Sequence, residues 1–218
     1  MCTKGKDVLL IGGSRGIGAG LKDAFSESNL ISVDRSVCDI SNTLDIDELF
    51  SSISNIDILI NNAAVCYAKP IEEIELSEWD EVLSINLTSY FYIIKKAIPL
   101  MRPGSKIVNV SSIAGRHRSL VSGVHYTSSK AGLIGLTRQL AQELGPKGIN
   151  INCVCPSQTM TPMLKQNMSD EDVVELSKRI PLGRIATVDE IVQPILFLCS
   201  DQASYIHGAC IDINGGQL

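Results

Sequence analysis

The sequence lacks long hydrophobic runs, basic clusters, low-complexity tracts and internal repeats. Its first apolar run, within MCTKGKDVLLIGG, is too short to span a membrane and has no small-residue cleavage site, so we expect neither membrane insertion nor a signal peptide. The net charge of −5 argues against a general nucleic-acid binder, which needs clustered Lys and Arg. What remains is an ordinary globular composition, with 44% hydrophobic and 20% charged residues.

Metal-ligand patterns are also missing from the sequence. The chain has three histidines and an odd number of cysteines, seven, most of them in apolar stretches. Cys153 and Cys155 have CxC spacing, but no second Cys or His pair matches them. We therefore expect no zinc or other metal site, reduced thiols in the core, and a cytoplasmic protein.

Strand-like and helix-like segments alternate along the chain. The 218 residues predict one domain spanning 1–218. Six apolar runs predict strands, most of them continuously apolar as in parallel strands buried on both faces: 7–12, 29–34, 56–61, 106–111, 151–155 and 209–213. Helical spacing lies between them, notably over 77–101 and 124–144. The alternation predicts an α/β fold, with a doubly wound parallel sheet of about seven strands and helices on both faces.

Local signals mark two helix starts and one turn. Ser77 is followed by Asp80, and Thr187 by Glu190, so each pair forms a predicted capping box. After ISVDRS the chain enters VCDIS with no room for a helix. We therefore expect a tight turn, and no helix, between the second and third strands.

The first predicted strand ends in GGSRGIG, residues 12 to 18. Gly12, Gly16 and Gly18 come between a strand and a helical segment, where a glycine turn lets the backbone approach a pyrophosphate. A turn used only for packing is the alternative. Asp34 ends the second strand at the spacing of a ribose-binding carboxylate, which favours NAD because it would repel a 2′-phosphate. Arg15 and Arg35 could instead bind that phosphate, so NADP stays open.

The segment YTSSK places Tyr126 and Lys130 four residues apart, on one face of a predicted helix. A free phenol has a pKa of about 10, too high for an efficient base near neutral pH. A neighbouring ammonium stabilises the phenolate and lowers that pKa, so the pair is typical of a general acid/base. A chance pair on an exposed helix is the alternative.

These motifs together resemble the short-chain dehydrogenase/reductase family, and the similarity covers essentially the whole chain. The glycine turn reads IGGSRGIG, followed by NNAA (61–64), NVSS and YTSSK. The resemblance implies a Rossmann-like fold and an NAD(P)-dependent oxidoreductase that transfers hydride between a nicotinamide cofactor and a secondary alcohol or ketone. A catalytically idle NAD(P)-binding sensor or scaffold is the alternative. Ile11, Ala64 and Ser157 depart from the family pattern without removing a group that hydride transfer needs.

The resemblance also implies the site residues. Tyr126 would exchange the substrate proton, Ser112 would hold the substrate oxygen, and Asn86 would bind a water linking Lys130 to solvent. The catalytic residues are therefore expected to be Asn86, Ser112, Tyr126 and Lys130. The expected cofactor-binding residues are Gly12, Ser14, Arg15, Gly16, Ile17, Gly18, Asp34, Asp39, Ile40, Asn62, Tyr126, Lys130, Thr159 and Thr161.

Two further segments bear on the substrate and partners. Residues 156–182 match the family's substrate lid, and their apolar inner face would come from Met160, Met163, Leu164 and Met168. The basic stretch of Arg116, His117 and Arg118 favours a small alcohol or ketone with an acidic group, unless these side chains face solvent or a neighbouring subunit. Apolar residues on more than one face of helices 77–101 and 124–144 predict a homo-oligomer, with a tetramer expected.

Overall fold

A six-stranded parallel sheet forms the centre of the part of the chain that the structure describes, as expected from the apolar runs. The computed structural model describes residues 4–119, 121–162, 164 and 169–217. The strand order is β2-β1-β3-β4-β5-β6, with every neighbouring pair parallel. The strands are β1 (Asp7–Ile11), β2 (Asn29–Val33), β3 (Ile58–Asn61), β4 (Lys106–Val110), β5 (Asn150–Pro156) and β6 (Cys210–Ile213). The count is six rather than about seven.

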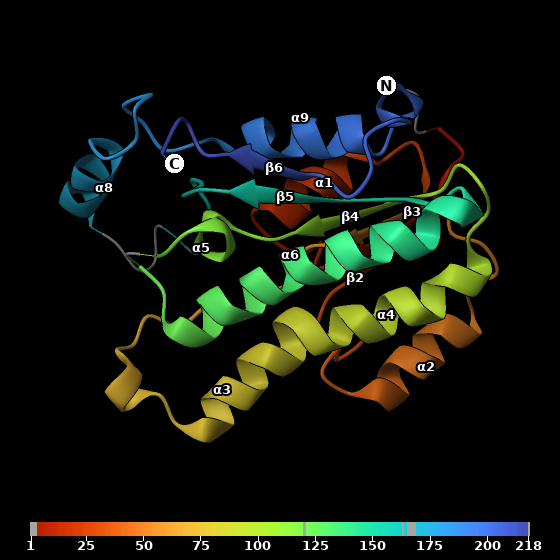
Figure 1. The fold of residues 1–218 in the computed structure, drawn as a ribbon, viewed down its shortest axis with the longest axis horizontal. Helices are drawn as coiled ribbons and strands as arrows, with labels where there is room; N and C mark the ends of the chain where they lie inside the picture. Colours follow the sequence, from red (N-terminus) through yellow and green to blue (C-terminus); the bar gives the residue numbers. More distant parts are fainter. Residues whose placement is uncertain (1–3, 120, 163, 165–168, 218) are drawn as a thin grey trace.

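Helices cover both faces of this sheet (Figure 1). One layer contains α1 (Ile17–Ala24) and α9 (Val188–Leu198), and the other contains α2 (Thr43–Ser51), α3 (Leu76–Leu83), α4 (Ser89–Ala97) and α6 (Val124–Leu144). Side chains alternate between the layers along each strand. On β1, Val8 and Leu10 pack against α1 and α9, whereas Leu9 and Ile11 pack against the other layer.

The connection after β2 is partly as expected. A tight turn does follow the strand, because the amides of Val37 and Cys38 both bond to the carbonyl of Asp34. However, α2 comes between this turn and β3, so the expectation of a helix-free connection is wrong. Asn42 caps α2 by accepting a hydrogen bond from the amide of Leu44. Burial of Ile46 and Phe50 against the sheet then stabilises a helix that the sequence analysis did not place.

One of the two predicted helix caps is confirmed. Thr187 and Glu190 form a reciprocal capping box at the start of α9. Ser77 does not cap α3, because the helix begins one residue earlier, at Leu76, and Glu75 occupies the capping position. From α3 the chain continues through a π-turn (η2, Ser84–Thr88) into α4 and the 3₁₀ turn η3 (Ile98–Leu100), close to the predicted range 77–101.

The parallel arrangement brings the carboxyl ends of all strands to one edge of the sheet. Loops that follow different strands therefore meet there, and ligands of open α/β sheets bind at that edge. The short helix α5 (Ile113–Arg116) follows β4, and α8 (Asp170–Ser177) belongs to the segment after β5. In the described part of the chain, the longest and most apolar helices fall short of what a membrane crossing requires.

Candidate active site

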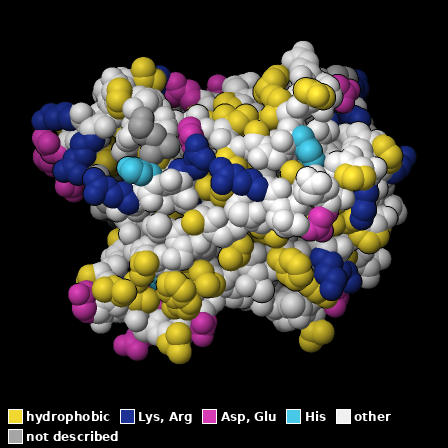
Figure 2. Space-filling model, in the orientation of Figure 1, with side chains coloured by type: hydrophobic (Ala, Val, Ile, Leu, Met, Phe, Trp, Pro, Cys, Tyr) yellow, Lys and Arg dark blue, Asp and Glu magenta, His cyan; other side chains and the backbone are white. Residues whose placement is uncertain are grey.

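A cavity of about 1060 Å³ lies at the carboxyl edge of the sheet. The last residues of four strands line it: Ile11, Val33, Val110 and Pro156. The molecular surface is hollowed between the α8 side and the α3 side, where these loops converge (Figure 2). Fourteen of the expected site residues line the cavity: Gly12, Ser14, Arg15, Gly16, Ile17, Asp34, Asp39, Ile40, Asn62, Ser112, Tyr126, Lys130, Thr159 and Thr161. Gly18 and Asn86 lie behind its wall.

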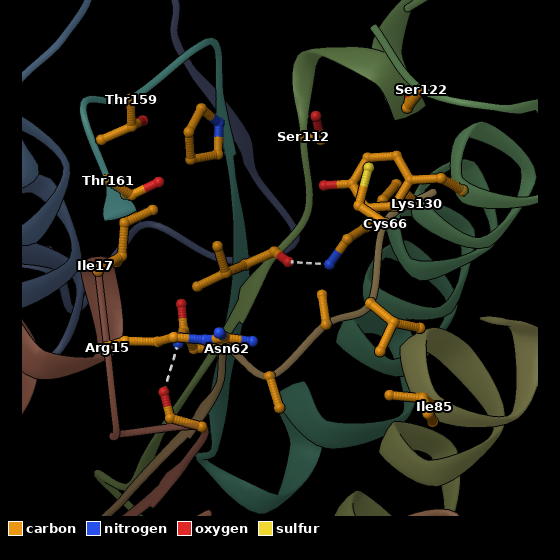
Figure 3. Close-up of a pocket in the computed structure, with 18 of the residues that line it drawn as sticks. Arg15, Ile17, Asn62, Cys66, Ile85, Ser112, Ser122, Lys130, Thr159 and Thr161 are labelled. Atoms are coloured by element: carbon orange, nitrogen blue, oxygen red, sulfur yellow. Dashed lines mark hydrogen bonds between the residues drawn. The ribbon is translucent and has the colours of Figure 1, made fainter. Parts of the chain in front are cut away.

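The glycine turn after β1 has no room for side chains. A Cβ on Gly12 would lie 2.5 Å from the amide nitrogen of Ala63, and φ there is +91°. A Cβ on Gly18 would lie 1.8 Å from the carbonyl oxygen of Gly12. Asn62 fixes the same carbonyl by donating a hydrogen bond to it at 2.7 Å (Figure 3). Helix α1 starts directly after Gly16 without a side-chain cap, so its first amides are available to a diphosphate, and this cradle fits a dinucleotide.

Asp34 lies at the opposite end of the cavity from the catalytic candidates. Its Oδ1 accepts hydrogen bonds from the amide of Ser36 at 2.9 Å and from the Ser36 hydroxyl at 2.6 Å. These bonds hold the pKa of the Asp34 carboxyl below its ordinary value, so a full negative charge faces this end of the cavity. Arg35 reaches toward Asp39, at 3.6 Å, with a largely exposed side chain.

Ser112, Tyr126 and Lys130 converge at the other end. Ser112 follows β4 and caps α5 by accepting a hydrogen bond from the amide of Ala114 at 3.1 Å. Tyr126 and Lys130 occupy successive turns at the start of α6, and the Ser112 hydroxyl lies near the Tyr126 phenol and lowers its pKa slightly. The Lys130 Nζ lies 5.7 Å from the Tyr126 ring centre and donates to the carbonyl of Val110 at 2.8 Å (Figure 3).

Burial dominates the protonation of this pair. It raises the pKa of the Tyr126 phenol, the nearby Cys66 thiol raises it further, and the Ser112 hydroxyl lowers it by less. Burial also lowers the pKa of the Lys130 ammonium to about 8. Desolvation thus raises the pKa of Tyr126 above its ordinary value, and the Lys130 Nζ donates to the carbonyl of Val110, so the expectation that Lys130 lowers this pKa stays a prediction.

Comparison with known proteins identifies a protein family and several similar chains. A family model described as Enoyl-(Acyl carrier protein) reductase matches residues 14–217. The chain is 32% identical over 243 residues to the 3-oxoacyl-(acyl-carrier-protein) reductase FabG of Buchnera aphidicola, which covers 99% of this chain and 98% of the relative. It is 36% identical over 177 residues to an uncharacterized short-chain type dehydrogenase/reductase of Sinorhizobium fredii, with 79% of this chain and 69% of the relative covered.

A solved structure is also similar to this chain over nearly its whole length. The ligand-free aldohexose dehydrogenase of Thermoplasma acidophilum superposes with a TM-score of 0.88 at 30% identity, and the match covers 99% of this chain and 94% of that one. This chain belongs to the short-chain dehydrogenase/reductase family. It is an NAD(P)-dependent oxidoreductase that transfers hydride between a nicotinamide cofactor and a secondary alcohol or ketone.

In this short-chain dehydrogenase/reductase, Asn86 has a structural environment that its sequence position did not reveal. It lies in the π-turn η2 and is fully buried. Its side-chain amide pairs with the backbone of Val65, accepting from the amide at 3.0 Å and donating to the carbonyl at 2.9 Å. It also donates to the Ser129 hydroxyl at 3.2 Å, and Ser129 donates to the carbonyl of Tyr126. Asn86 therefore ties the loop after β3 to the helix that carries Tyr126.

That loop contributes cavity residues that the sequence analysis missed. Val65, Cys66, Ala68 and Lys69 all line the cavity, directly after the NNAA segment. Cys66 lies next to Lys130 at the catalytic end (Figure 3), and burial raises the pKa of its thiol to about 11. No motif marks this loop as part of the site. The topology could have identified it, because a loop at the carboxyl end of a central parallel strand is a ligand-binding position.

The basic stretch expected to bind an acidic substrate has a different partner. Arg116 forms a bidentate pair with Asp212 on β6, through Nε and a terminal nitrogen, both at 3.0 Å. Neither Arg116 nor its neighbours His117 and Arg118 line the cavity. The geometry therefore gives no support to an acidic substrate.

The expected lid is only partly described. Met160 and Leu164 pack against a small apolar cluster of Leu176, Ile180 and Ile185, and Leu164 also lines the cavity. Met163 and Met168 lie outside the described residues. The described part of this segment thus adds an apolar wall beside the catalytic end.

Gly18→Ala tests the packed glycine turn. Its new Cβ collides with the carbonyl of Gly12, so the turn must open, and we expect cofactor affinity to fall at least about tenfold, or 1.4 kcal/mol. Cofactor titration by fluorescence measures this. Gly135→Ala is the matched control, because a Cβ there meets no atom within 4 Å. Equal affinities of the two variants would show that the turn tolerates a side chain.

Proposed function

We propose that Tyr126 is the group that gives a proton to, and takes one from, the substrate oxygen. The observation that carries this proposal is the convergence of Ser112, Tyr126 and Lys130 on one wall of the cavity, next to a glycine turn that fits a dinucleotide. A raised pKa keeps the Tyr126 phenol protonated at neutral pH, as a proton donor in carbonyl reduction must be. The bound nicotinamide supplies or accepts the hydride.

The other residues have complementary roles in this proposal. The Ser112 hydroxyl, which lies near the Tyr126 phenol, holds the substrate oxygen and stabilises the negative charge that develops on it. The Lys130 ammonium is the closest positive group to the phenol and favours the phenolate when an alcohol is oxidised. Asn86 acts as a positioning residue, because its contacts are to Val65 and Ser129 rather than to the cavity.

The proposed substrate class is a ketone with an aliphatic chain, such as a 3-oxoacyl thioester, and its alcohol. The wall near Tyr126 is mainly apolar, with Val65, Cys66, Ala68, Val121 and Leu164 lining it. Such a wall solvates an alkyl chain well and leaves the hydroxyl groups of a sugar without partners. The reductase activity in the names of several relatives agrees with this class.

A few unpaired polar atoms suit the remaining polar part of such a substrate. Among the described residues, the buried Ser122 hydroxyl and the buried Gln158 side-chain oxygen have no hydrogen-bond partner, and both residues line the cavity. Ile71 and Leu76 are exposed hydrophobic residues at the entry to α3, and Figure 2 shows hydrophobic side chains on the α3 side of the hollow. A substrate that is apolar along most of its length, with one or two polar groups, matches both features.

The proposal extends to assembly and location. We infer a homo-oligomer, a tetramer in the family pattern, that pairs through α4 and α6, since Phe91 on α4 remains half exposed. Light scattering that reported only monomer would contradict it.

We also place the enzyme in the cytoplasm, because the six cysteines in the described residues carry free thiols.

A substrate panel tests the proposed class. With NADH or NADPH, we expect kcat/KM for medium-chain 3-oxoacyl thioesters to exceed that for aldohexose oxidation by at least about a hundredfold, because each well-buried methylene contributes about 0.8 kcal/mol. Steady-state kinetics with acyl chains of increasing length checks the reason, since kcat/KM should rise with chain length. A preference for sugars would refute the apolar substrate while leaving the oxidoreductase intact.

Tyr126→Phe tests the proton donor. Removing one hydroxyl should leave cofactor affinity nearly unchanged and lower kcat by about 10²- to 10⁴-fold, the usual contribution of a general acid. Stopped-flow reduction and cofactor titration measure the two quantities separately. Tyr205→Phe, at a fully exposed tyrosine, is the control. Near-normal turnover of Tyr126→Phe would remove Tyr126 from the reaction.

Asp34→Asn tests cofactor choice. The ionised carboxylate should give the wild type a preference for NAD, and neutralising it should shift the NADP-to-NAD ratio of kcat/KM upward by roughly tenfold or more, since the carboxylate repels a 2′-phosphate of like charge. Asp23→Asn, on the outer side of α1, is the charge-matched control. A wild type that prefers NADP would mean that Arg15 and Arg35 outweigh the carboxylate.

A further inference from the structure

Three thiols meet where β5 pairs with the edge strand β6. Cys153 and Cys155 project from the same face of β5, with their sulfur atoms 3.8 Å apart. Cys210, on the edge strand β6, is the in-register partner of Cys153, and it packs against Cys153 and Cys155. All three pack beneath Ile134 of α6. None of them lines the cavity, so the proposed reaction leaves this cluster without a role.

The three thiols have unequal access to solvent. Cys153 and Cys155 are completely buried, whereas Cys210 is partly exposed. The cluster therefore combines one partly exposed cysteine with a neighbouring cysteine that solvent cannot reach. This is the arrangement of an attacking thiol with a resolving thiol.

Two arginines face the accessible thiol. Arg138 of α6 is hydrogen-bonded to Cys210, and Arg116 of α5 adds a second guanidinium nearby. Asp212, two residues along β6, partly offsets Arg116 through their ion pair. Interaction with the Cys153 thiol and, to a smaller extent, the two guanidinium groups lowers the pKa of the Cys210 thiol, and burial offsets part of this effect. Cys153 has its pKa raised by its two thiol neighbours and by burial, so it stays protonated.

We propose that Cys210 and Cys153 form a peroxide-sensitive pair that closes a disulfide between β6 and β5. Neighbouring strands lie about 4.8 Å apart, within the range of Cα separations that a disulfide spans. The in-register position of the two residues means that the bond forms without sliding one strand along the other. Cys155 lies opposite Asp212 instead, which makes Cys153 the resolving thiol.

The chemistry balances with hydrogen peroxide as the oxidant. The Cys210 thiolate attacks one peroxide oxygen, an S–O bond forms, the O–O bond breaks and hydroxide leaves, which gives a sulfenic acid. The Cys153 sulfur then attacks the Cys210 sulfur, the S–S bond forms, the S–O bond breaks, and the hydroxyl departs as water with the Cys153 proton. Two electrons pass from the thiols to peroxide, which becomes two waters.

Thiol mapping on the full chain tests the pair. Reduced protein is exposed to hydrogen peroxide at pH 7, denatured in excess maleimide and digested for mass spectrometry. The first product should be a Cys153–Cys210 cross-linked peptide, two hydrogens lighter than the separate peptides, while Cys66 and Cys199, whose thiol pKa values burial raises, remain alkylated. Oxidation that begins at Cys66 or Cys199 overturns the proposal.

Variants separate the roles of the thiols. Cys210→Ser should abolish the cross-link, Cys153→Ser should leave a Cys210 sulfenic acid that dimedone traps, and Cys199→Ser, a buried thiol in the other core layer, should cross-link as the wild type does. A cross-link that persists in Cys210→Ser refutes the assignment.

Arg138→Gln retains every thiol and so avoids variants that fail to fold. Its loss of a guanidinium should move the midpoint of the oxidation rate against pH upward, and should slow oxidation at pH values below that midpoint by about threefold for each pH unit that the midpoint moves, since there the thiolate fraction falls faster than nucleophilicity rises. A wild-type midpoint near 8.5, that of an ordinary thiol, would falsify the role of the arginines and with it the proposal.

Discussion

The buried amide of Asn86 holds the two halves of the candidate active site together. The loop after β3 forms one wall of the cavity, and α6 carries the catalytic candidates on the other. A single side chain satisfies the backbone of Val65 in the loop and the hydroxyl of Ser129 in the helix, so no polar atom of this amide is left unpaired in the core. The π-turn puts Asn86 at that junction, and such turns often lie at functional sites.

The two ends of the cavity differ in solvation, and this difference divides their tasks. Asp34 lies at the solvent-exposed end, where hydrogen bonds from Ser36 keep its carboxylate ionised. In the proposed function, this charge repels the 2′-phosphate of NADP. Tyr126 lies at a dry end, where desolvation keeps the phenol protonated. Electrostatic interactions are stronger at the buried end because water does not screen them there. The hydroxyl of Ser112 and the ammonium of Lys130 would therefore interact with a substrate oxygen with little competition from water.

The sequence alone predicts what local spacing determines and misses what distant contacts determine. Gly12 and Gly18, and likewise Tyr126 and Lys130, are recognisable because each pair acts within a single turn or helix. The pairing of Arg116 with Asp212 joins residues 96 positions apart, so no local pattern could show that the guanidinium is already engaged. The pKa of Tyr126 also escaped prediction, because burial depends on every element that covers the phenol.

Helix α6 links the catalytic end to the thiol cluster through one stripe of side chains. Tyr126, Lys130, Ile134 and Arg138 follow one another at four-residue intervals, so each lies about 6 Å further along the axis and is turned about 40° from the previous one. The first two line the cavity, the third covers Cys153 and Cys155, and the fourth reaches Cys210. The adjoining stripe is fully buried and anchors the helix, with Ser129 bonded to Asn86 and Thr137 bonded to Asn109. Because a rigid helix carries both stripes, the positions of the proton donor and of the arginine beside the edge thiol are set by the same packing against the sheet.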